Sequence, residues 1–149
     1  MLECNARTSG LEQELGVAPG PGLLDHLRAG CSLDETVRVT LLRGLYFMPV
    51  GADTTHFSGL IRSPGLQSAF SKLREQFDLI ILDGPSTLGS RDITILANLV
   101  DSMVLVVRAG LTASRLVRQA IEAFSPELLA GVVLNGSRAD LPHWLESRL

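Results

Sequence analysis

The sequence of 149 residues has few lysines, few cysteines and few aromatic side chains. Twelve of its thirteen basic residues are arginine, and Lys72 is the single lysine. With 13 basic against 16 acidic residues the formal net charge is -3, so the chain has no general attraction to nucleic acid or to anionic lipid. No basic cluster compensates locally, and we therefore expect no nucleic-acid partner.

Long hydrophobic runs are also missing. Runs such as residues 103–107 are far shorter than the roughly 18 residues that a membrane helix needs, so no direct membrane insertion is expected. Glu3 stands near the N-terminus in place of a basic cluster, and no apolar stretch follows it, which argues against a signal peptide. Cys4 and Cys31 form no CxxC pair, which argues against a disulfide framework or a zinc site. These absences predict a cytoplasmic protein.

The hydrophobic fraction of 46% is sufficient for the core of one ordinary domain, and we expect residues 1–149 to form a single domain. Short runs rich in β-branched residues predict four strands, at residues 45–50, 79–82, 103–107 and 132–134. The runs are continuous and do not alternate with polar residues. This pattern is typical of parallel strands that are covered on both faces.

Helix signals lie between these runs. Ser32 and Glu35 have the spacing of a capping box ahead of a helix predicted over residues 36–42. Ser63 and Pro64 fit the start of the clearest amphipathic helix. Its predicted apolar face carries Leu66, Phe70, Leu73 and Phe77.

Two further helices are predicted, one over residues 92–100 and one that Thr112 caps, and residues 16–22 are predicted as a surface loop. Helices that alternate with buried strands indicate an α/β fold, in which a mostly parallel sheet is flanked by helices.

Ligands of open α/β sheets bind beyond the carboxyl ends of the strands, so the residues that follow each apolar run are the site candidates. Asp83 follows residues 79–82 in the form of a Walker B element, whose acid holds a magnesium-bound water near nucleotide phosphates. An Asp in this place can equally start a turn. Arg108 and Asn135 follow the next two runs, where an ordinary ion pair and an ordinary turn are the alternatives.

Six motifs occur in order along the chain: GPGLLDHL (residues 20–27), LYFMPVG (45–51), DGPS (83–86), RDI (91–93), VVRAG (106–110) and GVVLNG (131–136). Together they resemble motifs of the bacterial tyrosine kinases and related P-loop ATPases of capsule and exopolysaccharide biosynthesis, which are relatives of the MinD and ParA ATPases. The resemblance implies a P-loop NTPase-like fold and a site for ATP or ADP with magnesium.

The resemblance also implies roles for individual residues. Asp83 would be a catalytic acid and the magnesium residue, while Asn135 and Arg108 would contact the nucleotide. Residues 2–7 (LECNAR) resemble a second acidic motif of the family, DxDxR, with Glu3 and Asn5 at the two Asp positions. Glu3 is therefore the second catalytic candidate.

The sequence departs from the family in two respects. It contains no GxxxxGK[ST] loop, since Lys72 lies inside the predicted amphipathic helix, and we expect a domain truncated at its N-terminus that lacks the first strand and the Walker A loop. Phosphoryl transfer depends on positioning and charge neutralisation, so such a chain should be inactive alone. The autokinases also carry a C-terminal tyrosine cluster, whereas Tyr46 is the single tyrosine here and falls in a strand predicted to be buried.

These features predict a degenerate or truncated nucleotide-binding domain that regulates polysaccharide biosynthesis or export. Its implied partner is a membrane polysaccharide co-polymerase or a kinase chain of the family, which would hold it at the inner face of the membrane; self-association is a further alternative. One competing hypothesis is a fragment of an active tyrosine kinase or ATPase. Another is a MinD-like or ParA-like positioning factor, against which the short acidic C-terminus argues.

Overall fold

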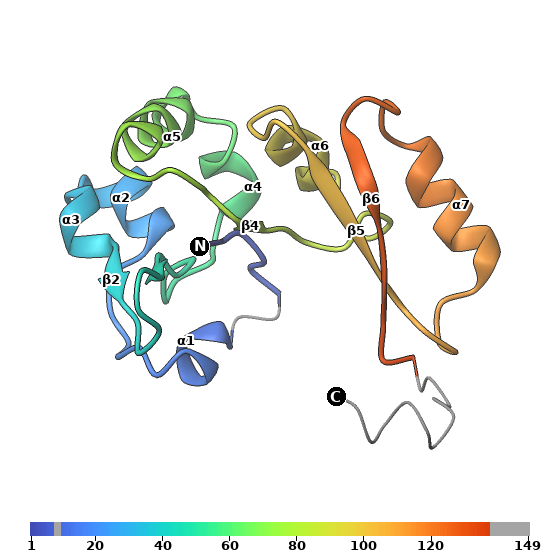
Figure 1. The fold of residues 1–149 in the computed structure, drawn as a ribbon. Helices are drawn as coiled ribbons and strands as arrows, with labels where there is room; N and C mark the ends of the chain where they lie inside the picture. The colour runs from blue at the N-terminus through green and yellow to red at the C-terminus, as the bar shows by residue number, and fades with distance from the viewer. Residues whose placement is uncertain (8–9, 138–149) are drawn as a thin grey trace, which may run out of the picture. The chain divides into compact units, whose positions relative to one another are not determined.

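The computed structural model describes residues 1–7 and 10–137, and internal contacts divide the chain into two units, residues 1–99 and 100–149. Each unit contains both helices and strands (Figure 1). None of the helices within the described residues is long and apolar enough to cross a membrane.

Four short strands of unit 1 form two two-stranded sheets. They are β1 (Leu2–Glu3), β2 (Arg38–Val39), β3 (Tyr46–Phe47) and β4 (Leu82–Asp83). β1 pairs with β4 in parallel, and β2 pairs with β3 in antiparallel. A parallel bridge between Leu2 and Met48, directly after β3, joins the two pairs. The backbone N–H of Met48 donates to Met1 at 2.9 Å, and the N–H of Glu3 donates to Met48 at 2.9 Å. β1 therefore lies between β4 and the end of β3.

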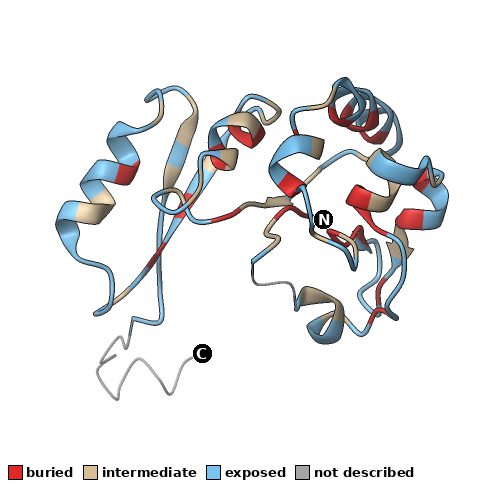
Figure 2. Cartoon of the chain, turned by 180° about the vertical axis from the view of Figure 1, so that it is seen from behind, coloured by how far each residue is buried: buried red, intermediate tan, exposed pale blue. Residues whose placement is uncertain are grey.

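Six helices belong to unit 1: α1 (Leu11–Glu14), α2 (Leu23–Ala29), α3 (Leu33–Thr36), α4 (Phe57–Leu60), α5 (Pro64–Gln76) and α6 (Asp92–Ala97). α5 confirms the predicted amphipathic helix, because Leu66, Phe70 and Leu73 are buried along one side (Figure 2). Phe77 is partly buried against the same core, which also holds Leu23 and Leu24 of α2. This apolar core supports the sheet that carries the candidate acids.

The capping box is confirmed, but the helix predicted behind it is wrong. Ser32 Oγ accepts from the N–H of Glu35 at 3.2 Å, and the N–H of Ser32 donates to the Glu35 carboxylate at 2.8 Å. α3 nevertheless ends at Thr36, and β2 follows where residues 36–42 were predicted to be helical. The β-branched Val37 and Val39 favour extended backbone, and pairing of β2 with β3 holds them there.

Two of the predicted strands are shorter than their apolar runs. β3 covers only Tyr46–Phe47 of residues 45–50, and β4 begins at Leu82, where β1 provides a partner. The prediction that Tyr46 is buried is wrong, because Tyr46 is 42% exposed, whereas Phe47 beside it is fully buried. The alternation follows from the pleat of a strand that has only one covered face.

The α2 helix begins at a close contact with the residues after β3. The N–H groups of Leu23 and Leu24 donate to the carbonyls of Pro49 and Val50 at 2.9 and 3.0 Å. Gly22, the residue before the helix, donates to the Asp25 carboxylate at 2.8 Å. A Cβ on Gly22 would lie 2.3 Å from the Pro49 oxygen and 2.5 Å from the Gly51 nitrogen, so only glycine fits. Residues 16–22, which lead into this contact, lie outside helices and strands, as predicted.

Unit 2 is a strand–helix–strand arrangement of β5 (Met103–Arg108), α7 (Ser114–Glu122) and β6 (Leu129–Asn135), with the two strands parallel. Leu105, Val107 and Ala120 form its buried cluster. Two sequence predictions are wrong here. Ala113, and not Thr112, precedes the helix, and β5 is not covered on both faces, because Val104 and Val106 are exposed.

Candidate functional site

The two predicted acids of unit 1 lie next to each other at the carboxyl ends of paired strands. Glu3 ends β1, Asp83 ends β4, and the two are partners in the parallel register. The N–H groups of Leu2 and Cys4 donate to the carbonyls of Ile81 and Asp83, both at 2.8 Å, and fix this register. Parallel pairing thus brings together two carboxylates that are 80 positions apart in the sequence.

Glu3 is held by the backbone on both sides of its carboxylate. Glu3 is only 1% exposed. One carboxylate oxygen accepts from the N–H of Gly10 at 3.3 Å, and the other accepts from the N–H of Val50 at 3.2 Å. A buried carboxylate needs such donors, and here they tie the segment before α1 and the segment after β3 to the end of β1. These two hydrogen bonds fix the Glu3 carboxylate at the end of β1.

Asp83 is the more open member of the pair. It is partly buried, and burial together with the charge of Glu3 raises the pKa of its carboxyl group. The thiol of the fully buried Cys4 also has a raised pKa, because of its burial and the charges of Asp83 and Glu3. Negative charge therefore accumulates at the ends of β1 and β4, an environment that favours a cation beside Asp83.

The raised pKa of Asp83 predicts that replacing it with asparagine stabilises the protein at neutral pH. A carboxyl group whose pKa is higher in the folded state favours folding when protonated, and it loses that contribution as the pH rises through its folded-state pKa. Asp83→Asn should therefore raise the Tm at neutral pH, by about 1–2 °C because solvent screens a partly exposed group. The gain should shrink as the pH falls toward about 3.9, the ordinary aspartate pKa.

Thermal unfolding followed by circular dichroism across this pH range provides the measurement. Glu75→Gln, which neutralises an exposed acid of α5, is the matched control and should change the Tm little. A wild-type chain that is as stable as Asp83→Asn at neutral pH would contradict the prediction.

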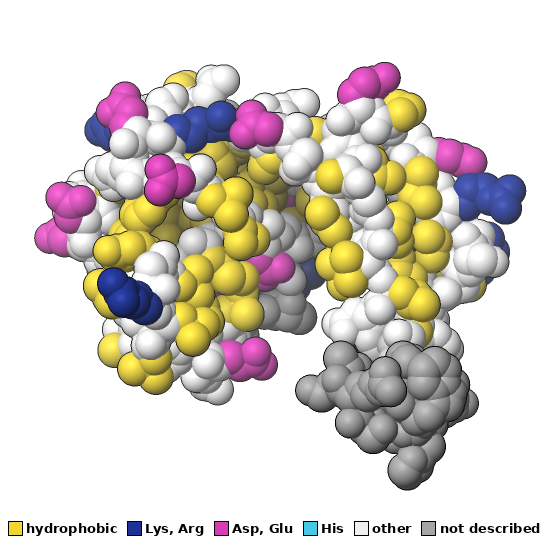
Figure 3. Space-filling model, viewed as in Figure 1, with side chains coloured by type: hydrophobic (Ala, Val, Ile, Leu, Met, Phe, Trp, Pro, Cys, Tyr) yellow, Lys and Arg dark blue, Asp and Glu magenta, His cyan; other side chains and the backbone are white. Residues whose placement is uncertain are grey.

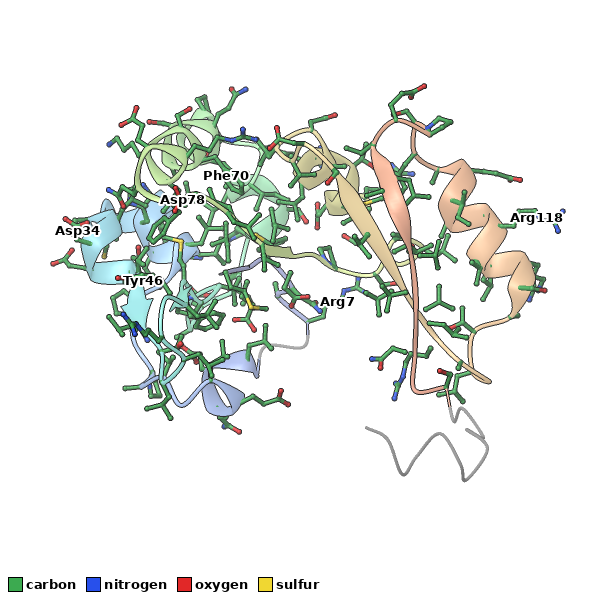
Figure 4. The ribbon with its side chains drawn as sticks, in the orientation of Figure 1. Arg7, Asp34, Tyr46, Phe70, Asp78 and Arg118 are labelled. Carbon is green, nitrogen blue, oxygen red and sulfur yellow. The ribbon has the colours of Figure 1, made fainter. Side chains whose placement is uncertain are left out.

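Arg7, which was not among the predicted site residues, lies on the segment that follows β1 (Figure 4). Its Nη1 lies 3.9 Å from the position that a Cβ on Gly89 would take, and the Ser86 hydroxyl lies 3.8 Å from the same point. The N–H of Arg7 donates to the Asn5 side chain at 3.3 Å. Arg7 therefore places a cation beside Gly89, in the loop that follows Asp83. Its sequence signal is the spacing Glu3-x-Asn5-x-Arg7, which ends in a basic residue.

The other two candidates, Arg108 and Asn135, form a second pair within unit 2. They are partners in the parallel register of β5 and β6, at the carboxyl ends of both strands. The N–H of Ala109 donates to the Asn135 carbonyl at 2.9 Å, and both residues of the pair are exposed. The side chains of Arg108 and Asn135 are thus presented together at one end of unit 2, with no ion pair for Arg108 among the described residues.

The residues of unit 1 fit a magnesium ion that Asp83 holds. Magnesium is usually bound by one or two carboxylates, with water and substrate phosphates as its other ligands. Asp83 offers a carboxylate in a negatively charged environment, whereas both oxygens of Glu3 already accept backbone hydrogen bonds. Within residues 1–7 and 10–137, no three His, Cys, Asp or Glu side chains cluster as a complete metal cage. The arrangement suits a water-mediated ion more than a fully protein-bound one.

No family model matches the chain, but several known proteins are similar to it in sequence. A putative tyrosine-protein kinase EpsB of Ralstonia solanacearum is 31% identical over 108 residues, which are 72% of this chain and 14% of that protein. The succinoglycan biosynthesis transport protein ExoP of Rhizobium meliloti is 29% identical over 140 residues, 91% of this chain and 18% of that protein.

Solved structures of kinase domains are also similar to this chain. The kinase domain of VpsO superposes with a TM-score of 0.83 at 26% identity, over 90% of this chain and 68% of that chain. The tyrosine kinase domain of BceF superposes with a TM-score of 0.78 at 27% identity, over 91% of this chain and 55% of that chain. The chain is thus related to bacterial tyrosine kinases and to a transport protein of polysaccharide biosynthesis. Its fold is α/β of the P-loop NTPase type, as the sequence predicted.

The chain spans about a seventh to a fifth of the length of the kinase-family relatives that it matches.

Proposed function

We propose that this chain is a degenerate or truncated nucleotide-binding domain that acts as a regulatory component of polysaccharide biosynthesis or export. The observation that carries the proposal is the position of Asp83, which ends a parallel strand beside Glu3 in a chain related to bacterial tyrosine kinases. We take ATP or ADP with magnesium as the ligand class. A membrane polysaccharide co-polymerase, or a kinase chain of the family, is the proposed partner and would bring the chain to the inner face of the membrane.

In this proposal each residue of unit 1 has a separate task. Asp83 accepts hydrogen bonds from water bound to magnesium, and the ion, when bound, would neutralise phosphate charge. Glu3 positions Asp83 by fixing the end of β1 through its two backbone hydrogen bonds. Arg7 adds a positive charge near the loop after Asp83, where an anionic ligand would gain from it.

Within unit 2, the exposed pair Arg108 and Asn135 provides a second set of proposed nucleotide contacts. Asn135 carries an amide group that can both donate and accept hydrogen bonds, which is what recognition of an adenine edge requires. Arg108 offers a planar guanidinium group that can bind phosphate oxygens. Binding without catalysis is the expected outcome for these 149 residues, because they contain one lysine and no GxxxxGK[ST] loop.

Removal of the Asp83 carboxylate is expected to weaken magnesium-dependent nucleotide binding. Calorimetric titration of the 149-residue chain with ADP or ATP plus magnesium should give a heat of binding for the wild type. Asp83→Ala should weaken binding by about 10- to 100-fold, the usual cost of removing a group that supports a metal through its ligands. Glu75→Ala, which removes an exposed carboxylate of α5, is the matched control and should bind like the wild type.

A wild-type chain that shows neither heat nor thermal stabilisation at millimolar nucleotide would contradict the proposal, and so would equal binding by Asp83→Ala and Glu75→Ala.

The competing function is that of an active tyrosine kinase or ATPase to which these residues contribute one part. The observation that favours it is the small share of the kinase relatives that the chain covers, 14% of EpsB and 18% of ExoP. The DNA upstream of the first codon discriminates between the two functions. An in-frame glycine-rich loop with a lysine would favour the kinase, and an autophosphorylation assay on the longer product would then test it.

A further inference from the structure

A groove of about 560 Å³ opens on unit 1, lined by the β2–β3 hairpin and by the segment that joins α5 to β4. Val39 and Leu79 line it and are 75% and 74% exposed, and Tyr46 and Phe77 line it with their ring centroids 5.3 Å apart. Figure 3 shows apolar side chains gathered over this part of unit 1. Exposed apolar surface that is gathered in one place is typical of an interaction site.

The charged side chains that line the groove are all acidic. Asp34 and Asp78 line it, and no lysine, arginine or histidine does. Both aspartates lie on the same side of unit 1 as Tyr46 (Figure 4). Neither forms an ion pair among the described residues. An occupant that suits this groove therefore has apolar side chains followed by a positive charge.

The turn of the neighbouring hairpin has this chemistry. Leu41 is 87% exposed, Leu42 is 60% exposed, and Arg43 follows them as an exposed cation with no ion pair in the described part of the chain. Gly44 of the same turn is part of the groove lining. The turn thus borders the groove of its own chain and leaves it open.

We propose that the groove receives the Leu41–Leu42–Arg43 turn of a second copy of this chain, in a two-fold symmetric dimer. In such a dimer one surface patch contacts its own counterpart, so each copy inserts its turn and each copy receives one. Leu41 and Leu42 pack on Val39, Tyr46 and Leu79 of the second copy. Arg43 lies between Asp34 and Asp78 of that copy, and charge complementarity fixes the register of the two chains.

Charge reversal provides a sharp test, with analytical ultracentrifugation of the 149-residue chain over a range of concentrations. The wild type should dimerise as its concentration rises. Arg43→Glu alone and the double variant Asp34→Arg/Asp78→Arg alone should each weaken dimerisation by at least about tenfold, because each faces like charges across the symmetric contact. Mixed in equal amounts, the two variants face opposite charges at both contacts and should form a heterodimer of near wild-type affinity.

Arg118→Glu on α7 is the matched control, since it reverses one exposed cation outside the groove lining, and it should dimerise like the wild type. Because all four substituted residues are exposed, circular dichroism should show folded variants. A wild type that stays monomeric at every concentration overturns the proposal and leaves the groove to a different protein. A mixture that associates no better than either variant alone overturns it as well.

Discussion

Gly22→Ala is expected to lower the free energy of unfolding by about 3 kcal/mol or more, because the added methyl group meets backbone atoms that cannot move aside. The new Cβ would lie 2.3 Å from the Pro49 oxygen and 2.5 Å from the Gly51 nitrogen. Relieving this clash would pull α2 away from the carbonyls that accept its first two N–H groups. Urea unfolding followed by far-UV circular dichroism gives the measurement.

Gly59→Ala in α4 is the matched control, because no atom lies within 4 Å of the position of its new Cβ. Alanine is the better helix former, so this variant should be neutral or slightly more stable, by about 0.5–1 kcal/mol at most. Equal stability of the two variants would show that the contact between α2 and the residues after β3 is looser than described.

Glu3→Ala is expected to cost about 2–4 kcal/mol of unfolding free energy. The substitution removes the acceptor of the Gly10 and Val50 N–H groups, and each buried donor left without a partner costs about 1–3 kcal/mol. It also leaves a cavity at a residue that is almost fully buried. Glu3→Gln keeps the size and one acceptor oxygen, so its loss should be smaller.

Glu14→Ala, an exposed carboxylate at the end of α1, is the control for Glu3→Ala and should change stability by no more than about 0.5 kcal/mol. If urea unfolding showed Glu3→Ala to be no less stable than Glu14→Ala, the positioning role of Glu3 would be wrong. Nucleotide titration of Glu3→Gln adds a second readout, because a positioning residue replaced by its near isostere should leave the Asp83 contact with magnesium largely intact.

Local sequence patterns predicted those parts of the structure that depend on residues close together in the chain. The capping box of Ser32 and Glu35 and the apolar face of α5 follow from the spacing of residues within one or two turns. The predicted helix over residues 36–42 failed because pairing with β3, which lies further along the chain, decides the conformation of Val37 to Val39. β1 has only two residues, too few for any periodicity to show.

For the candidate site, the sequence predicted residues at the ends of strands but not the contacts that each one makes. The sequence identified Asp83 and Arg108 because each follows an apolar run. The structure places both at the carboxyl ends of strands, which is where ligands of open α/β sheets bind. The difference between Glu3 and Asp83 depends on the N–H groups of Gly10 and Val50, which reach Glu3 only in the folded chain. Arg7 was missed as a site residue because its neighbour, the loop at Gly89, is more than 80 residues away.

The location of β1 has a consequence for the order of folding. Its backbone contacts to Met48, Ile81 and Asp83 join residues that are 45 to 79 positions apart in the sequence. Contacts between residues so far apart in the sequence form slowly, because a long loop must close before the backbone hydrogen bonds between the strands can form. We therefore expect β1 to be among the last strands of unit 1 to pair during folding. Until β4 pairs with β1, the candidate acid Glu3 has no partner strand at its site.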